Sequence, residues 1–128
     1  MIRLFSMLTI TLGLMSCQLH NNAQKLDTAS FKTLELEEDV FVIDIRTSVE
    51  AASAYLDGTD YFIELNSYKF KGDISNLDKN KTYIVYSQSG VRSYNALNYM
   101  ENIGLTNLYE LKEGMQRWSD PSSMLTKL

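Results

Sequence analysis

The segment from Tyr83 to Leu97, YIVYSQSGVRSYNAL, restricts the fold of this chain more than any other part of it. It begins as an apolar run with β-branched residues, continues as a short polar stretch with one glycine, and ends as an amphipathic segment. This order predicts a buried strand, a tight loop and a helix. In sheets built from such units, ligands bind beyond the carboxyl ends of the strands, which is where the loop from Ser87 to Ser93 falls.

The rest of the chain repeats this alternation of strand and helix. The near-continuous apolar run 40–45 predicts a strand buried on both faces, and further strands are expected at 61–65, 81–87 and 107–111. Helices are expected at 28–39, 48–56 and 94–104, with a helical or irregular connection at 67–77 and a closing turn or helix at 114–118. Strands separated by helices of this length predict a mostly parallel central sheet flanked by helices, in one α/β domain.

Composition and charge exclude several classes of function. A chain of 128 residues, 45% of them hydrophobic, suffices for one ordinary domain. The net charge is −4 and there is no run of lysine or arginine, which disfavours a nucleic-acid partner. The single histidine and the single cysteine, His20 and Cys17, lie near the N-terminus, so the sequence indicates no metal site and no cofactor.

Residues 1–17 have the features of a targeting signal. Arg3 precedes an apolar stretch from Leu4 to Met15, which is shorter than the roughly 20 residues of a membrane-spanning helix. The stretch LMSC, which ends at Cys17, resembles the bacterial lipobox, where the signal is cut before a cysteine that receives lipid. We therefore expect a lipoprotein signal peptide at 1–16 and lipidation of Cys17; an ordinary signal peptide and an uncleaved anchor are the alternatives.

The domain boundaries follow from this assignment. The lipidated cysteine and a flexible polar tether are expected at 17–27, the folded domain at 28–122 and a C-terminal tail at 123–128. His20 lies in the tether, where no role is expected for it. The protein is then expected in a bacterial cell envelope, anchored to a membrane by lipid, with its domain facing the periplasm or the exterior.

The loop from Ser87 to Ser93 has the residue types of an anion site. Successive backbone N–H groups at the start of a helix can point at one oxyanion, and Gly90 permits the backbone angle that this requires. Arg92 could hold the oxyanion or could simply brace the loop, and the sequence leaves both roles open. The candidate anion-binding residues are Ser87, Gln88, Ser89, Gly90, Val91, Arg92 and Ser93.

Several motifs, taken in order, resemble the rhodanese domain of the sulfurtransferase superfamily. They are the IDIR strand with Asp44 and Arg46, the acidic Glu50, the SGVRS loop, the NIGLTNLYEL step and the closing EGMQRW. The resemblance extends from about Phe31 to Trp118, and it implies a single rhodanese-like domain. Asp44 and Arg46 are expected to support the loop more than to act on a substrate.

The same resemblance implies a reaction for which this chain lacks the nucleophile. In that family the active loop begins with a cysteine that carries a persulfide, and Ser87 occupies its position. A serine hydroxyl is a far weaker acid than a thiol, and a serine nucleophile would need a general base, yet the expected domain has no histidine. Tyr55 also stands where a histidine is usual, and Glu113-Gly114 where two glycines are usual. No catalytic residue is therefore assigned, and the domain is expected to be a pseudoenzyme.

Three functions remain open from the sequence. The first is a membrane-tethered, catalytically inactive rhodanese-like module whose loop binds a small oxyanion or an acidic segment of a partner protein. The second is a purely structural or interaction element that keeps the loop as a relic, and the third is an enzyme of altered chemistry that uses a thiol from another protein. If Tyr55 or Tyr94 lies across the loop, a small anion is excluded.

Overall fold

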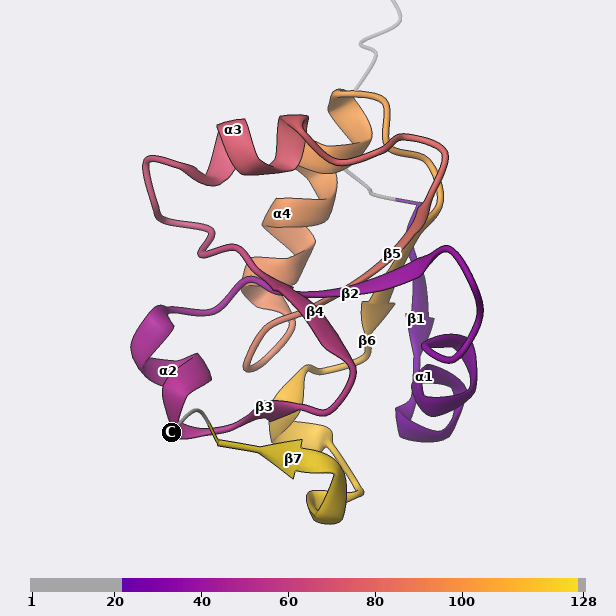
Figure 1. Cartoon of the computed structure of the whole chain (residues 1–128), viewed down its shortest axis with the longest axis vertical. Helices are drawn as coiled ribbons and strands as arrows, with labels where there is room; N and C mark the ends of the chain where they lie inside the picture. Colours follow the sequence, from indigo (N-terminus) through magenta and orange to yellow (C-terminus); the bar gives the residue numbers. More distant parts are fainter. Residues whose placement is uncertain (1–21, 127–128) are drawn as a thin grey trace, which may run out of the picture.

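The computed structural model describes residues 22–126, which form an α/β domain around a parallel sheet (Figure 1). The sheet has five strands in the order β1-β6-β5-β2-β4, and every neighbouring pair is parallel. Its strands are β1 (Gln24–Leu26), β2 (Val40–Asp44), β4 (Thr59–Phe62), β5 (Thr82–Tyr86) and β6 (Leu108–Leu111). A two-stranded antiparallel sheet pairs β3 (Tyr55–Leu56) with β7 (Met124–Leu125). The predicted single domain with a mostly parallel central sheet is confirmed.

Two of the helices, α1 and α2, begin at N-cap residues whose side chains accept one of the first N–H groups. The helical segments of the described residues are α1 (Thr28–Leu34), α2 (Ser48–Ser53), α3 (Phe70–Ser75), α4 (Val91–Asn102), η1 (Met115–Arg117) and η2 (Pro121–Ser123). Asp27 caps α1 by accepting the N–H of Ser30 at 2.8 Å, and Thr47 and Glu50 form a reciprocal capping box at the start of α2. Within residues 22–126, no helix has the length and apolar character needed to cross a membrane.

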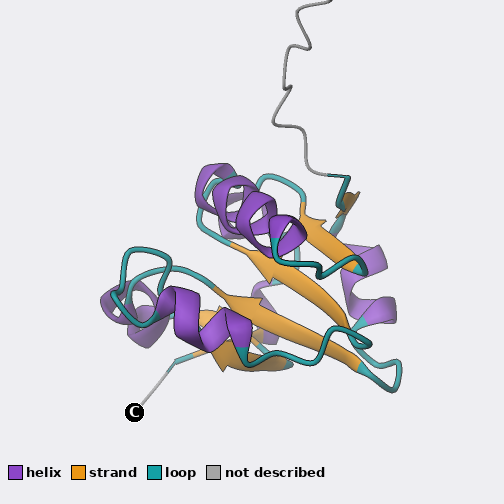
Figure 2. Ribbon diagram, turned by 90° about the horizontal axis from the view of Figure 1, so that it is seen from above, coloured by secondary structure: helices purple, strands orange, loops and turns teal. Residues whose placement is uncertain are grey.

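Apolar side chains cover both faces of the sheet, and Figure 2 shows helices on either side of it. Ile43 and Val85 point into a cluster with side chains of α3 and α4, which includes Leu97. Val42 and Ile84 point to the opposite face, where α1, β3 and the C-terminal turns contribute a second cluster. Neighbouring residues of one strand thus enter different clusters, which explains why the strands are apolar runs without alternation.

Two strands lie in segments that the sequence assigns to the tether and to the tail. Residues 24–26 form β1, which pairs with β6 in the register Leu26↔Leu111, so the ordered chain begins before residue 28. Residues 124–125 form β7, which pairs with β3 through Leu56↔Met124. Both strands are very short, and QKL contains a single apolar residue, so no periodic pattern marks either of them. Cys17 and His20 lie outside the described residues.

Other predicted boundaries move by a few residues. The helix expected at 48–56 ends at Ser53, because the chain then turns into β3. The strand expected at 61–65 runs from Thr59 to Phe62, and the helix expected at 94–104 already begins at Val91. Asp44 of β2 pairs in register with Tyr86 of β5, so the segments that follow these two strands leave the sheet side by side. This edge of the sheet carries the predicted site.

Candidate functional site

The loop between β5 and α4 is organised around the side chain of Ser87. Ser87 follows the last residue of β5 and is completely buried. Its Oγ accepts hydrogen bonds from the backbone N–H groups of Gly90 at 3.0 Å and Ser93 at 3.3 Å. Gly90 has a φ of 91°, in the left-handed region that glycine tolerates best. The hydroxyl therefore fills the centre of the loop and uses two N–H groups that were expected to face an anion.

The buried carboxylate of Glu110, on β6, is hydrogen-bonded to Ser93. The Ser93 hydroxyl is placed to donate to Glu110 Oε1 at 2.7 Å, and also lies 2.9 Å from the carbonyl oxygen of Gly90. Glu110 is 2% exposed, and its Oε2 has no hydrogen-bond partner among the described residues, although Lys25 Nζ lies 4.0 Å away. The sequence points to Glu110 only weakly, as one acidic residue inside the strand-like run NLYEL.

Glu110 has no direct hydrogen bond with the Ser87 hydroxyl among the described residues. The Ser87 and Ser93 hydroxyl oxygens are 3.4 Å apart, which is long for a hydrogen bond between hydroxyl groups. The groups found to hydrogen-bond Ser87 Oγ in the described part of the chain are two backbone N–H groups and this hydroxyl, none of which is a base. With Ser87 fully buried as well, its hydroxyl acts as a cap of the loop.

The segment around Gly114 closes over the first residues of the loop. The N–H of Met115 donates to the carbonyl oxygen of Ser87 at 3.0 Å, and the N–H of Gln116 donates to that of Gln88 at 3.0 Å. Gly114 has a φ of 65°, and a methyl group there would overlap the Ser87 carbonyl oxygen and come within 2.7 Å of the Gln88 carbonyl. Only glycine fits this contact, which explains the glycine in the closing EGMQRW motif.

Asp44 and Arg46 form a buried ion pair beside the loop. Arg46 Nη2 donates to Asp44 Oδ2 at 2.7 Å and to the carbonyl oxygen of Ala54 at 2.6 Å, while Nη1 reaches Gln88 Oε1 at 3.3 Å. Tyr86 donates its hydroxyl to Asp44 Oδ2 at 3.0 Å. Burial opposes the charge of Arg46, but the hydrogen bonds and charge of Asp44 outweigh it and raise the pKa of the guanidinium. Arg46 thus links the end of β2 to the loop.

Arg92 is engaged by Glu50 of α2. Its Nη1 donates to Glu50 Oε2 at 2.7 Å and its Nη2 to Oε1 at 2.6 Å, in the two-pronged geometry that a guanidinium forms with a carboxylate. These bonds with Arg92, assisted by the N–H and hydroxyl of Thr47, lower the pKa of Glu50 to about 2. Arg92 therefore braces the loop against α2, and an anion would have to compete with Glu50 for it.

The tip of the loop is open to solvent. Gln88 and Ser89 are exposed, as is Val91 with 67% of its surface accessible. Tyr55 packs edge-on against Phe62, with ring centroids 5.1 Å apart, and does not line the cavity beside the loop. A cavity of about 310 Å³ beside the loop is lined by Lys25, Ser89, Gly90, Val91, Tyr94, Glu110 and Glu113. Two carboxylates and one ammonium thus set the charge next to the loop.

The sequence profile of the rhodanese-like domain matches residues 27–121, which is most of the chain. The chain belongs to the rhodanese-like domain family. The matched range contains the loop, both ion pairs and Glu110. Among residues 22–126 of this rhodanese-like domain, no group of three or more histidine, cysteine, aspartate or glutamate side chains could hold a metal ion.

Curated relatives and solved structures agree with this assignment. A protein named sulfurtransferase from Allochromatium vinosum is 29% identical over 82 residues, which cover 64% of this chain and 74% of the relative. The putative sulfurtransferase YtwF of Bacillus subtilis is 26% identical over 96 residues, covering 74% and 89%. The crystal structure of a rhodanese-like domain protein from Staphylococcus aureus superposes with a TM-score of 0.68 at 24% identity, covering 82% of this chain and 99% of that one.

The rhodanese-like fold brings together the residues that the sequence singled out. Arg46, which is paired with Asp44, contacts the loop at Gln88, and Glu50 of α2 contacts it at Arg92. The predicted members of the loop have different surroundings: Ser87 and Ser93 are buried, Gly90 and Arg92 are half-buried, and Gln88, Ser89 and Val91 are exposed. Gln88, Ser89 and Val91 are therefore the loop residues most open to a ligand from solvent, and Ser87 and Ser93 are not open to it.

Proposed function

We propose that this rhodanese-like domain does not transfer sulfur and acts as a binding module held at a bacterial membrane. In this proposal Ser87 stands at the position of the family's nucleophilic cysteine. The observation that carries it is the state of Ser87 Oγ, which is buried and bonded to the N–H groups of Gly90 and Ser93. Cys17 is the only cysteine of the chain and lies before the matched range, so no second thiol in the domain can replace the missing one.

The chemistry of sulfur transfer explains why serine is inactive. A thiolate attacks the outer sulfur of thiosulfate, a new S–S bond forms, and sulfite leaves with the electron pair of the broken bond. A serine hydroxyl is far less acidic than a thiol, and an S–O linkage does not store sulfur reversibly. Two relatives of this chain are named sulfurtransferases. In this proposal their activity does not extend to this chain.

Mass spectrometry of thiosulfate-treated protein tests this proposal. Wild-type protein is expected to gain no sulfur atom, and Ser87→Ala serves as the matched control. In Ser87→Cys the N–H groups of Gly90 and Ser93 would point at the thiolate and lower its pKa, so this variant is expected to acquire one sulfur atom. Sulfur bound to Ser87 of the wild type would contradict the proposal.

The exposed tip of the loop is the part that supports ligand binding. The backbone N–H groups of Gln88 and Ser89 have no hydrogen-bond acceptor among the described residues, and they lie just before the N-terminus of α4. We propose that a small oxyanion binds there, without Arg92. Glu110 and Glu113 line the adjoining cavity and would repel an extended acidic segment, so the compact anion fits better than an acidic partner protein.

A titration followed by amide NMR shifts tests the ligand. Sulfate and thiosulfate are added at constant ionic strength, with chloride as the matched control. Saturable shifts at Gln88, Ser89 and Gly90 are expected for the two divalent anions and not for chloride. Shifts that do not saturate, or that spread over the surface without favouring the loop, would rule out the oxyanion.

A second candidate, a structural or interaction element with a relic loop, is favoured by the two closed ion pairs. Arg46 Nη2 lies 2.7 Å from Asp44 Oδ2, and Arg92 Nη2 lies 2.6 Å from Glu50 Oε1, so both guanidinium groups are paired within the domain. Neither guanidinium is then available to a ligand unless its pair opens. Absence of saturable anion binding in the titration selects this candidate.

The proposed membrane tether has its own test. Cys17 is proposed to receive lipid after removal of residues 1–16, so the full chain expressed in a bacterium should sediment with membranes. Cys17→Ser should leave the protein in the soluble fraction, or uncleaved in the membrane. Release of the wild-type protein by high salt alone would contradict a lipid anchor.

A further inference from the structure

A second cavity lies at the other end of the sheet, away from the loop. It has a volume of about 580 Å³, within the range of small-molecule sites. Phe41 and Tyr83 line it near the starts of β2 and β5, whereas Ser87 follows the end of β5. Its lining residues are Phe41, Tyr61, Phe62, Ile63, Asp73, Asn76, Leu77, Asp78, Lys81 and Tyr83.

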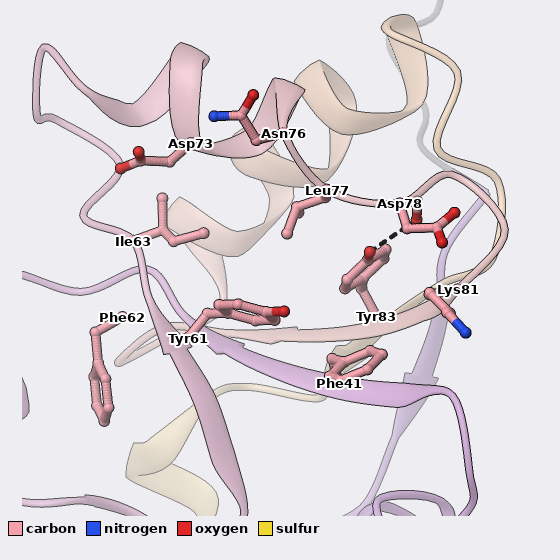
Figure 3. Close-up of a pocket in the computed structure, with 10 residues that line it drawn as sticks. All are labelled: Phe41, Tyr61, Phe62, Ile63, Asp73, Asn76, Leu77, Asp78, Lys81 and Tyr83. Atoms are coloured by element: carbon pink, nitrogen blue, oxygen red, sulfur yellow. Dashed lines mark hydrogen bonds between the residues drawn. The ribbon is translucent and has the colours of Figure 1, made fainter.

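Three aromatic rings form one wall of this cavity, as Figure 3 shows. The ring centroid of Phe41 lies 5.9 Å from that of Tyr61 and 6.0 Å from that of Tyr83. Tyr83 is fixed in place because its hydroxyl donates to the carbonyl oxygen of Asp78 at 2.8 Å, across the cavity rim (Figure 3). Tyr61 keeps 39% of its surface exposed on the edge strand β4. Phe41 is half-buried and Tyr83 is buried, so Tyr61 is the ring of this wall that is most open to solvent.

The lining of the cavity includes two carboxylates. Asp73 lies at one end of the cavity and Asp78 at the other, with Leu77 between them (Figure 3). Among the described residues, the Asp73 carboxylate has no ion-pair partner, and Asp78 Oδ1 accepts only the backbone N–H of Asn80, at 2.8 Å. Lys81 also lines the cavity, but its ammonium group is bound to Asp39. The rim therefore carries excess negative charge.

We propose that this cavity binds a small organic ammonium ion with an apolar body. The apolar body would lie against the accessible surfaces of Tyr61 and Phe41, and the ammonium group would face the ring of Tyr61 and a rim carboxylate. Cations are attracted to the faces of aromatic rings, and opposite charges at a rim strengthen the selection.

The charge and shape of the cavity exclude other ligand classes. An anion would face Asp73 and Asp78 with no free cation on the lining, since Lys81 is paired. A neutral aromatic compound would fill the apolar wall but would gain nothing from the carboxylates. The prediction is therefore selection by charge among ligands of one shape.

Three probes of matched shape test the proposal by amide NMR and calorimetry: phenethylamine, 2-phenylethanol and 3-phenylpropanoate. Phenethylamine is expected to bind at least ten-fold more tightly than the neutral alcohol, and the carboxylate to show no saturable binding. Its amide shifts should be concentrated at Tyr61, Leu77 and Tyr83. Added salt should weaken the binding of the amine and leave the alcohol unchanged.

Variants separate the two parts of the recognition. Asp73→Asn/Asp78→Asn should weaken phenethylamine binding about ten-fold and bring it to the level of the alcohol. Tyr61→Leu should weaken both the amine and the alcohol several-fold. Asp57→Asn and Tyr68→Ala are matched controls, because both residues are exposed and neither lines the cavity. Melting temperatures show whether each variant is folded.

Two results would overturn the proposal. One is equal affinity for the amine and the alcohol, which would make the cavity an apolar site without charge selection. The other is a set of amine-induced shifts concentrated at Gln88–Gly90, which would place the cation beside Glu110 and Glu113. The sulfate titration of the loop is independent of both results, so this proposal and the proposed function can fail separately.

Discussion

The charged groups at the two ends of the sheet differ in how far they are paired within the domain. At the carboxyl ends of the strands, both arginines are paired with carboxylates and the Ser87 hydroxyl is held by the loop that it caps. At the other end, the exposed carboxylates of Asp73 and Asp78 line the aromatic cavity. Neither forms an ion pair within the described residues, although the charge of Asp78 attracts Lys81. The end that carries the family motifs is closed by its own hydrogen bonds, and the end without motifs is open.

This difference separates stability from binding. Groups that are satisfied within the domain stabilise it, and removing one partner leaves the other buried and uncompensated. Groups that face solvent without a partner contribute little to folding and remain available to a ligand. Substitutions near the loop should therefore lower the free energy of unfolding, whereas substitutions on the rim of the aromatic cavity should not.

Asp44→Ala is expected to have the largest effect. It leaves the Arg46 guanidinium buried without its carboxylate, and the loss of one partner of a buried ion pair lowers stability by about 3–5 kcal/mol. Urea unfolding of the two proteins measures the difference. Asp44→Leu/Arg46→Met, which removes both charges, should recover part of the loss. A loss below about 1 kcal/mol for Asp44→Ala would mean that this pair does not hold the loop end together.

Gly114→Ala is expected to come next. The added methyl group would meet the carbonyl groups of Ser87 and Gln88, and the φ of 65° is unfavourable for alanine, so a loss of about 3 kcal/mol is expected. Gly72→Ala is the matched control, because a methyl group at that position in α3 meets nothing within 4 Å. Thermal unfolding should show a lower midpoint for the first variant and an unchanged or higher one for the second.

The Arg92–Glu50 pair should give a smaller, pH-dependent effect. The pKa of Glu50 falls from its ordinary value of 4.5 to about 2 in the folded state, so its contribution is complete above pH 4.5 and is lost as the pH falls toward 2. Both side chains are partly exposed, which reduces the contribution to about 1 kcal/mol. The stability difference between wild type and Glu50→Gln should therefore shrink between about pH 6 and about pH 3. A difference that is constant over this range would contradict the ion pair.

The rim of the aromatic cavity should show the smallest effect on folding. Asp73→Asn/Asp78→Asn is expected to change the free energy of unfolding by less than about 0.5 kcal/mol per site, since both carboxylates are exposed. Chemical denaturation of this variant and of the wild type measures the difference in the free energy of unfolding, and the phenethylamine titration measures the loss of binding. A loss comparable to that of Asp44→Ala would show that the rim belongs to the folding core.

The sequence predicted the loop end of the sheet far better than the opposite end. The run from Tyr83 to Leu97 contains a strand, a loop and a helix in one continuous segment, so its pattern is visible without knowledge of the fold. The roles of Arg92 and Glu50 depend on a contact across 42 positions of the chain, and spacing alone could not decide between a ligand and a brace. Glu110 was missed because nothing local distinguishes a buried glutamate in a strand from an exposed one.

The aromatic cavity was not predictable for the same reason. Phe41, Tyr61 and Tyr83 lie on three different strands, and only the β4-β2-β5 order of the sheet brings them together. The strand β1 was not predicted because its three residues, QKL, are too few to show any periodicity. In both cases the deciding information is a long-range contact and not a local preference.

The most direct test of the proposed lack of sulfur transfer is the cyanide-dependent formation of thiocyanate from thiosulfate by the wild-type domain. We predict that the wild type and Ser87→Ala give the same rate, equal to that of the uncatalysed reaction, because neither has a thiolate in the loop. Turnover by the wild type well above that of Ser87→Ala would contradict the account and make Ser87 a catalytic residue.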